Sequence, residues 1–520
     1  MGGQLTGRGW VWRFAVLFVT AGLVGACTAG PSARPGIVVQ QAPDATSAPP
    51  SVTPEVPPLE DMSAGMAWRE CSAEIRGKLA EQKLPGWLPV QCGKVNAVLD
   101  SPYAPGRGVA RVQLLRAGNG PVPLVVVNDV DGLPGTLFAS RLAATLPQQF
   151  FERFSLIGMD RRGTGNSAAP KCLPDEIRRT IVGADPADLP IDTWLEAAQT
   201  AGQQCSIALE SQLPALDTWR TAADLDTLRE ALGVSRLNGI GHGEGSRVLS
   251  VFADRFPDKV GRLVLDGVPD PTQDAAVALE GVAKGAEAAF DAFAADCVNR
   301  QCELGTQPKR TLLELLGKLR ANPLPQPESL DLTAGSALHA VLIGLADRSA
   351  WPALSAALAK AAGGDPSGLV ALLTPVVLGT DVQAATLDST LVISCNDTKT
   401  RLSPERIKQY GEDWKKRFPT FGTLAAQRLA LCSPWTVPNQ PLPTPSARNA
   451  PPIVVIGTAS DAVTPEEGSK RAAQQLASGV YLSWQGGGHG ALGFSPCATD
   501  AAVSFLSDAK VPRNGTVCPP

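Results

Sequence analysis

The sequence predicts an α/β fold, and three observations support this prediction. Short apolar runs that suit buried parallel strands recur along the chain, at residues 262–267, 453–457 and 480–484. A helix is predicted at residues 224–233, where apolar residues recur at helical spacing and a glycine stands at the end. A glycine-rich turn occupies residues 241–245. Strands that alternate with helices in this way favour a mostly parallel sheet.

The glycine-rich turn is the most informative element of the chain. It has the pattern Gly241-x-Gly243-x-Gly245, and it lies between a predicted buried strand and a helix predicted at residues 248–256. α/β-Hydrolases have a nucleophilic serine at such a corner, in the pattern G-x-S-x-G. Position 243 therefore corresponds to the nucleophile, but Gly243 has no hydroxyl.

Two later segments provide the other members of a hydrolase triad. Asp461 lies in the loop after the strand predicted at 453–457, and His489 lies between two glycines after the strand predicted at 480–484. The chain order of nucleophile position, acid and histidine is that of α/β-hydrolases. We expect His489 at the general-base position, with Asp461 orienting its imidazole and stabilising the charged form.

Several residues have simpler or alternative roles. Asp461 could cap the helix that follows it, since aspartate favours that position. Asp266 or Asp270, at the end of the preceding parallel strand, could then supply the acid. His242 is expected to be an exposed residue of the turn, and His339 a helix residue of a cap.

Together these motifs resemble those of the exported tripeptidyl-aminopeptidase-like serine hydrolases of actinobacteria, relatives of the prolyl aminopeptidases. The resemblance runs from about residue 68 to the C-terminus. It implies an α/β-hydrolase fold with a mostly helical cap insertion, and peptides or small esters as ligands. We expect no cofactor and no metal site. The supporting segments are residues 160–167, 264–268, 461–465 and 488–490, with Cys497 and Cys518 beyond them.

Two departures from that family affect catalysis. Gly243 replaces the nucleophile, and the loop that usually reads G-G-P-G here reads Asp131-Gly132-Leu133-Pro134-Gly135. In the family, this loop donates one backbone N–H to the oxyanion hole, and the residue after the nucleophile donates the other. These positions are Leu133 and Glu244, which add a bulky side chain and a carboxylate beside the developing oxyanion.

The missing serine is expected to weaken or abolish catalysis. Removing the nucleophile of a triad costs on the order of a million-fold in turnover. Ser246 is the candidate substitute, although a serine in the first turn of a helix is more simply a capping residue. A serine introduced at position 243 is expected to lie within reach of His489. A dinucleotide site is an alternative for the turn, but its spacing does not match G-x-G-x-x-G.

Residues 271–447 are predicted to form a mostly helical cap over the pocket mouth. Far more sequence lies between the strands at 262–267 and 453–457 than one crossover needs, and its apolar residues have helical spacing. The core would comprise residues 65–270 and 448–520. With 520 residues, 44% of them hydrophobic, the chain can bury a large core. A net charge of −4 offers no basic patch suited to nucleic acid.

The N-terminus predicts export. Two arginines precede the apolar run at residues 14–24, which suits a signal peptide rather than a membrane span. The run ends in Val24-Gly25-Ala26-Cys27, a sequence similar to a bacterial lipobox, so residues 1–27 would be a lipoprotein signal and Cys27 the lipidated residue. A plain secretory signal is the alternative. Residues 28–64, rich in Pro, Ala, Ser and Thr, are expected to form a disordered tether.

The cysteines agree with export. Ten of the eleven remain when Cys27 is set aside, an even number that suits an oxidising compartment. The spacing does not establish a connectivity, and a metal site is a further alternative. Pairing of neighbours would join Cys71 with Cys92, Cys172 with Cys205, Cys297 with Cys302, Cys395 with Cys432, and Cys497 with Cys518.

The sequence thus predicts an exported, membrane-anchored hydrolase-fold protein of peptidase or carboxylesterase type whose catalysis is weak or lost. The competing hypothesis is a binding protein of the cell envelope that uses the retained pocket for a peptide, a lipid or a partner protein. A membrane contact through the lipid anchor is expected, and no contact with nucleic acid. The oligomeric state is not predicted.

Overall fold

The computed structural model describes residues 55–79, 84–100, 105–106, 108–327, 329–435 and 442–520. The predicted signal peptide, the predicted lipidation residue Cys27 and most of the predicted tether lie outside these ranges. Among the described residues, none of the helices has the length and apolar character that a membrane crossing requires.

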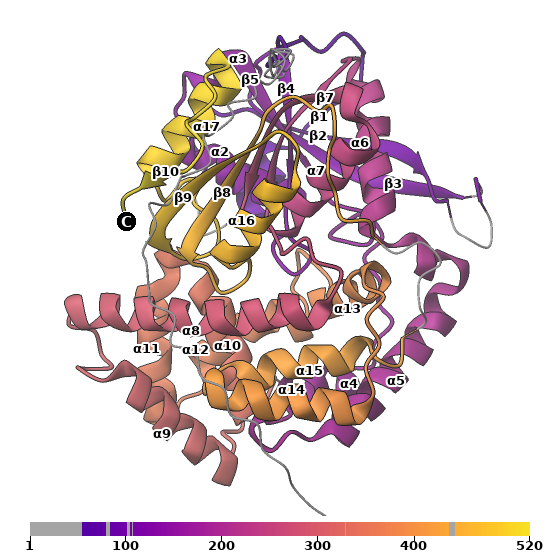
Figure 1. Cartoon of the computed structure of the whole chain (residues 1–520). Helices are drawn as coiled ribbons and strands as arrows, with labels where there is room; N and C mark the ends of the chain where they lie inside the picture. The colour runs from indigo at the N-terminus through magenta and orange to yellow at the C-terminus, as the bar shows by residue number, and fades with distance from the viewer. Residues whose placement is uncertain (1–54, 80–83, 101–104, 107, 328, 436–441) are drawn as a thin grey trace, which may run out of the picture. The chain divides into compact units, whose positions relative to one another are not determined.

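The strands form a ten-stranded sheet in the order β1-β2-β3-β5-β4-β6-β7-β8-β9-β10 (Figure 1). Neighbouring strands from β5 to β10 are parallel, whereas β1, β2, β3 and β5 pair antiparallel. This is the α/β-hydrolase arrangement that the sequence predicts. The strands are β1 (Arg69–Glu70), β2 (Val90–Val98), β3 (Val109–Ala117), β4 (Val122–Val127), β5 (Phe154–Met159), β6 (Leu237–His242), β7 (Val260–Asp266), β8 (Ile453–Ser460), β9 (Gly479–Gly487) and β10 (Thr516–Cys518).

Helices cover both faces of the sheet because successive strand residues point to opposite sides. On one face Val126 packs in a cluster with residues of α1, α2, α3 and α17, and on the other Val125 packs with residues of α6, α7 and α16. Full burial of a side chain of this size stabilises by roughly 1.5–3 kcal/mol. The core helices are α1 (Ser72–Lys78), α2 (Gly135–Thr145), α3 (Phe150–Arg153), α6 (Thr218–Leu232), α7 (Glu244–Arg255), α16 (Glu466–Gln475) and α17 (Pro496–Asp508), with the short 3-10 turn η3 (Pro257–Lys259).

The predicted core elements are confirmed. The helix expected at 224–233 is α6, and Gly233 ends it with a φ of 69°. The helix expected at 248–256 is α7, which begins four residues earlier, at Glu244, directly after the glycine-rich turn. The strands expected at 262–267, 453–457 and 480–484 are β7, β8 and β9.

The predicted cap region contains eight described helices, which lie together beyond the carboxyl ends of the parallel strands (Figure 1). Their apolar faces form a core of their own, in which Phe290, Val341 and Val392 are buried. These helices are α8 (Ala275–Asn299), α9 (Pro308–Ala321), α10 (Ala334–Ala346), α11 (Trp351–Ala362), α12 (Ser367–Val377), α13 (Thr386–Asp397), α14 (Pro404–Arg417) and α15 (Gly422–Cys432), with the 3-10 turn η4 (Arg348–Ala350).

The cap also includes a second, earlier segment of the chain, which corrects the predicted boundary. Helices α4 (Asp175–Gly183) and α5 (Ile191–Leu209), with the 3-10 turns η1 (Pro186–Asp188) and η2 (Glu210–Ala215), lie within the region 65–270 predicted as core. They pack instead against α10, α14 and α15. The buried carboxylate of Asp388 in α13 joins the two segments, because it accepts hydrogen bonds from Arg178 Nε at 2.6 Å and from the backbone N–H of Cys172 at 2.7 Å.

The last ten residues of the predicted tether lie on the core. The carbonyl of Pro57 accepts a hydrogen bond from Arg262 Nε at 3.1 Å, and the backbone N–H of Met62 donates to the Pro121 carbonyl at 2.9 Å. Val56, Leu59 and Met62 also pack against the core, so polar and apolar contacts together hold residues 55–64, which their proline-rich composition does not reveal.

The disulfides of the described residues join the five pairs of neighbouring cysteines named above. Two of them, Cys71–Cys92 and Cys497–Cys518, fasten the ends of the core. The other three lie in the two cap segments.

Candidate active site

The corner between β6 and α7 has the shape of a nucleophile elbow. Gly243 adopts φ 56° and ψ −123°, a region that costs a non-glycine residue about 1–3 kcal/mol. The neighbouring glycines let the helix approach the sheet, since a Cβ at Gly245 would lie 2.0 Å from the carbonyl oxygen of Val127. The backbone thus places position 243 where the sequence analysis expects the nucleophile.

His489 and Asp461 lie side by side at the carboxyl ends of β9 and β8. Nδ1 of His489 is 2.9 Å from Asp461 Oδ2, and both residues are buried. Asp461 is itself held by the backbone N–H groups of Val463 and Thr464, at 2.7 and 2.8 Å, and by the Thr464 hydroxyl at 2.9 Å. This is the geometry of a base and its orienting acid.

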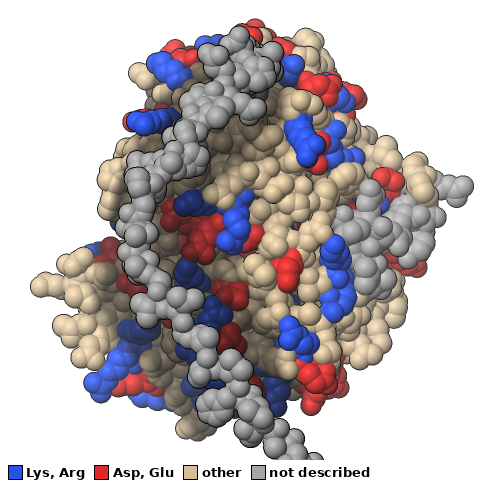
Figure 2. Space-filling view, viewed as in Figure 1, with Lys and Arg blue, Asp and Glu red and all other residues tan. Residues whose placement is uncertain are grey.

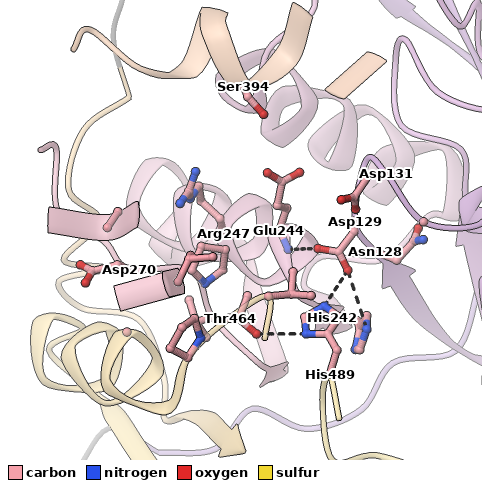
Figure 3. A pocket seen from close by; sticks show the side chains of 18 of the residues that line it. Asn128, Asp129, Asp131, His242, Glu244, Arg247, Asp270, Ser394, Thr464 and His489 are labelled. Atoms are coloured by element: carbon pink, nitrogen blue, oxygen red, sulfur yellow. Dashed lines mark hydrogen bonds and ion pairs between the residues drawn. The ribbon is translucent and has the colours of Figure 1, made fainter. Parts of the chain in front are cut away.

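The space of the missing serine side chain is filled by Asp129, a residue that the sequence analysis did not single out. A Cβ built on Gly243 would lie 2.0 Å from Asp129 Oδ1 and 2.3 Å from Oδ2. Asp129 Oδ2 is 3.0 Å from His489 Nε2, and Oδ1 accepts the backbone N–H of Glu244 at 2.7 Å (Figure 3). The carboxylate therefore occupies the space that a side chain at position 243 would need, and it binds the backbone N–H of Glu244.

The proton balance of this cluster opposes general-base catalysis by His489. Burial alone would raise the pKa of Asp129, but the charge and hydrogen bond of His489 lower it to about 2. Burial would lower the pKa of His489, but the charges of Asp461 and Asp129 raise it well above its usual value. The two carboxylates on either side of the ring thus favour the protonated imidazole.

These contacts correct the expectation that a serine at position 243 alone would meet His489. Its Cβ would overlap the Asp129 carboxylate, which cannot move aside without breaking its bonds to His489 and Glu244. Two acidic residues, Asp129 and Asp131, in a loop that is otherwise glycine-rich in related hydrolases were the sequence signal that could have revealed this arrangement.

His242 is not the exposed residue that was expected. Its side chain is 15% exposed and lies between two carboxylates, with Nε2 at 3.7 Å from Asp129 Oδ2 and Nδ1 at 3.6 Å from Asp266 Oδ2. Its ring stacks on Phe138 with 4.8 Å between the centroids. The position directly before the elbow turns this ring inward, toward His489.

The two residues predicted to line the oxyanion hole, Leu133 and Glu244, differ in the groups that they direct toward the site. Glu244 offers its backbone N–H at the expected place, while its carboxylate lies 3.7 Å from the buried guanidinium of Arg161. Leu133 lines the cavity, and its carbonyl oxygen accepts a hydrogen bond from Asn128 Nδ2 at 2.8 Å. The carboxylate beside the oxyanion position therefore belongs to Asp129 rather than to Glu244.

The remaining candidates have structural surroundings. Ser246 is fully buried in α7, and its hydroxyl has no hydrogen-bond partner among the described residues, so it neither caps the helix nor reaches the cavity. Asp266 accepts the backbone N–H of Ala491 at 2.8 Å, and Asp270 pairs with Arg471. His339 lies in cap helix α10, as expected.

A cavity of about 910 Å³ opens above this cluster, between the core and the cap. The core contributes Asp129, His242 and His489 to its wall. Ser394 of α13 lies across the cavity from these residues (Figure 3). Further lining residues from the cap are Leu279, Leu342, Ile343, Asp397 and Arg428.

Two arginines in the wall are available to a ligand. Arg247 of α7 and Arg428 of α15 line the cavity, and neither forms a hydrogen bond or ion pair of its side chain with another described residue. The other charged groups of the wall are partly neutralised, since Arg141 pairs with Asp347 at 2.8 Å. On the molecular face that Figure 2 shows, Lys and Arg lie among Asp and Glu without forming one basic patch.

The chain is similar in sequence to several known hydrolases. The family described as TAP-like protein matches residues 418–518. "Serine protease Hip1" of Mycobacterium tuberculosis H37Rv is 28% identical, over 87% of this chain and 90% of that protein. "Tripeptidyl aminopeptidase" of Streptomyces lividans is 27% identical, over 88% of this chain and 87% of that protein. "Carboxylesterase B" of the same Mycobacterium strain is 25% identical, over 75% of this chain and 79% of that protein.

Proposed function

Because this chain is a homologue of the tripeptidyl-aminopeptidase-like serine hydrolases, we propose that its cavity binds a peptide or a small ester without forming an acyl-serine intermediate. The observation that supports this most directly is the Asp129 carboxylate, which fills the place of the serine hydroxyl at Gly243. Loss of a triad nucleophile costs on the order of a million-fold in turnover. The raised pKa of His489 also opposes its action as a general base.

The cavity is consistent with ligand binding. Its volume of about 910 Å³ lies within the range of roughly 300–1,000 Å³ that is typical of small-molecule sites. Its wall combines apolar cap residues such as Leu342 with the unpaired Arg247 and Arg428. A guanidinium favours carboxylates, so these two residues suit a ligand with an anionic group, such as a short peptide with a free carboxyl terminus.

A binding protein of the cell envelope is the second candidate function. It is favoured by the glycine at position 243, where hydrolases have a serine, since a pocket that only binds a ligand needs no nucleophile. Export and anchoring through Cys27 belong to this proposal, because the predicted lipobox and most of the predicted tether lie outside the described residues. Multiple acyl chains on Cys27 would give the stable anchoring that a single chain does not.

A fluorophosphonate probe tests the absence of an activated serine. After incubation with excess probe, intact-mass measurement of the protein is expected to show no adduct, while an active serine hydrolase in the same solution is fully labelled. Binding of short peptides is measured in parallel by calorimetry, with Arg247→Ala as the variant that should weaken it. A stoichiometric adduct, at Ser246 or elsewhere, would contradict the proposal.

A further inference from the structure

Three side chains on the floor of the cavity converge in a way that serine catalysis does not require. Asp129, His242 and His489 each present one ligand atom, and these atoms all lie within 4.8 Å of one another. Asp129 Oδ2 is 3.0 Å from His489 Nε2 and 3.7 Å from His242 Nε2 (Figure 3). The rings of the two histidines are 4.4 Å apart between centroids.

We infer that Asp129, His242 and His489 bind a divalent transition-metal ion of the zinc type, with its remaining coordination positions open to the cavity. The inference rests on the proposed function for its ligand, because the ion would face the same cavity. Two imidazoles and one carboxylate form a donor set that zinc prefers in sites with an open position. His242 is the last residue of β6, Asp129 follows β4 and His489 follows β9, so all three lie at the carboxyl ends of parallel strands.

The separations of the ligand atoms suit such an ion. Zinc binds imidazole nitrogen and carboxylate oxygen at about 2.0–2.2 Å, so two ligand atoms in a tetrahedral site lie about 3.4 Å apart. The contacts of Asp129 Oδ2, at 3.0 and 3.7 Å, fall on either side of that value. The two imidazole ligand atoms lie within 4.8 Å of each other, so they would have to approach by up to about 1.4 Å to complete a tetrahedral site.

The far nitrogen of each histidine faces a buried carboxylate. Nδ1 of His489 contacts Asp461 at 2.9 Å, and Nδ1 of His242 lies 3.6 Å from Asp266, just beyond hydrogen-bond length. Metal-binding histidines almost always donate that N–H to a carboxylate, a backbone carbonyl or water, which fixes the tautomer and leaves Nε2 for the metal. His489 therefore has the outer partner that ligation requires, and His242 has a carboxylate just beyond hydrogen-bond distance.

Asp129 is fixed in the orientation that a ligand needs. The backbone N–H of Glu244 binds its Oδ1 at 2.7 Å, so Oδ2 faces both imidazoles. The absence of a Cβ at Gly243 gives this carboxylate its room. A salt bridge between Asp129 and His489 alone involves one imidazole, whereas a bound ion would use both.

A bound ion would replace the lost serine by a different route to hydrolysis. A water on the ion would supply hydroxide to the ester or amide carbonyl carbon, the C–O or C–N bond would break, and the proton of the water would leave with the alcohol or amine. The overall reaction consumes one water and needs no oxidant or other co-reactant. Arg247 or Arg428 would hold an anionic end of the same substrate.

Metal binding is tested on the full chain with the Cys27→Ala substitution. The other ten cysteines are all in disulfides, so this variant has no free thiol that could bind the metal instead. After removal of metal with a chelator, titration with Zn²⁺ is expected to show one ion per chain. Replacement by Co²⁺ is expected to give the visible absorption bands of a four- or five-coordinate site. Less than one-fifth of an equivalent of Zn²⁺ at about 100 μM free metal would overturn the inference.

Variants assign the ligands. His242→Gln and Asp129→Ala are expected to weaken Zn²⁺ binding by more than about 100-fold, and Asp266→Asn by about 10–100-fold through its histidine. His339→Gln, in the cap, is the matched control and should bind as the parent does. Circular dichroism and melting curves establish that each variant is folded. Unchanged affinity in folded His242→Gln would contradict the assignment.

The two proposals fail in different ways. If the protein binds peptides and resists the fluorophosphonate but takes up no Zn²⁺, only the metal site is wrong. If the chelated protein forms a serine adduct, the proposed function is wrong whatever the zinc result.

Discussion

The cavity floor has two sides, one formed by His489 and Asp461 and the other by the elbow at Gly243. The two sides differ in how closely they match the catalytic site of a serine hydrolase. On the histidine side, His489 and Asp461 have the contact at 2.9 Å and the backbone support that a triad needs. On the nucleophile side, the backbone of the elbow is present, but Gly243 has no hydroxyl and Asp129 fills its place.

This difference shows that the shape of an active site and its chemistry can be separated. The backbone of the elbow is held by close packing between β6, α7 and the end of β4, and many residues contribute to this packing. The nucleophile depends on one side chain. Under the proposed function, Gly243 and Asp129 change the chemistry of the site, while the fold and the cavity stay those of a hydrolase.

The largest effect is expected when the nucleophile side is restored. Gly243→Ser combined with Asp129→Gly provides a hydroxyl and removes the carboxylate that would overlap it. In metal-free buffer, hydrolysis of a p-nitrophenyl ester should rise by about 1,000-fold or more over the parent, because a serine nucleophile and its base contribute up to about a million-fold. Steady-state rates and fluorophosphonate labelling measure this.

Gly243→Ser alone is the control for that experiment. It should remain unlabelled and inactive, since Asp129 stays in place. Equal labelling of the single and the double variant would show that Asp129 does not block the elbow.

A smaller effect is expected when the histidine side is broken. His489→Ala leaves the buried carboxylates of Asp129 and Asp461 without their shared partner. Loss of one partner from a buried charge pair costs about 3–5 kcal/mol in the free energy of unfolding. Urea denaturation of the metal-free protein measures this. His242→Ala, whose contacts lie at 3.6 and 3.7 Å, should cost clearly less, so equal losses would refute the contrast between the two histidines.

The smallest effect concerns a histidine without an acidic partner. His339 contacts the Gly335 carbonyl at 3.1 Å, and burial lowers its pKa to about 4. The unfolded chain binds this proton near pH 6.5, so the stability present above pH 6.5 falls as the pH drops toward 4, by up to about 3 kcal/mol. Denaturant unfolding between pH 7 and 4 should show a shallower pH dependence in His339→Gln. Identical slopes in both proteins would contradict this assignment.

The sequence predicted the fold well where local patterns are strong. The apolar strands β7, β8 and β9 and the glycine that ends α6 have clear signatures, and the order of the elbow, Asp461 and His489 identified the fold. The cap segment of α4 and α5 was missed because its amphipathic helices look like ordinary crossover helices. Only contacts with residues far along the chain reveal their partners.

The candidate site was predicted less completely, because its departures depend on three-dimensional packing. The loss of a hydroxyl at Gly243 is visible in the sequence. That Asp129 reaches the same space, and that His242 turns inward rather than outward, follows from the curvature of the loop after β4 and from Phe138 beside the ring. The acidic residues of this loop are visible in the sequence, but no spacing rule for a single sequence shows where their side chains point.

The two-segment construction of the cap has a consequence during synthesis. Arg178 in the first segment cannot form its ion pair until Asp388, 210 residues later, has been synthesised. At about 5–20 residues per second, this interval lasts on the order of 10–40 s. Throughout it, the apolar faces of α4 and α5 lack the helices that cover them in the finished protein, so this stretch is a target for chaperones and a point where misassembly of the nascent chain can begin.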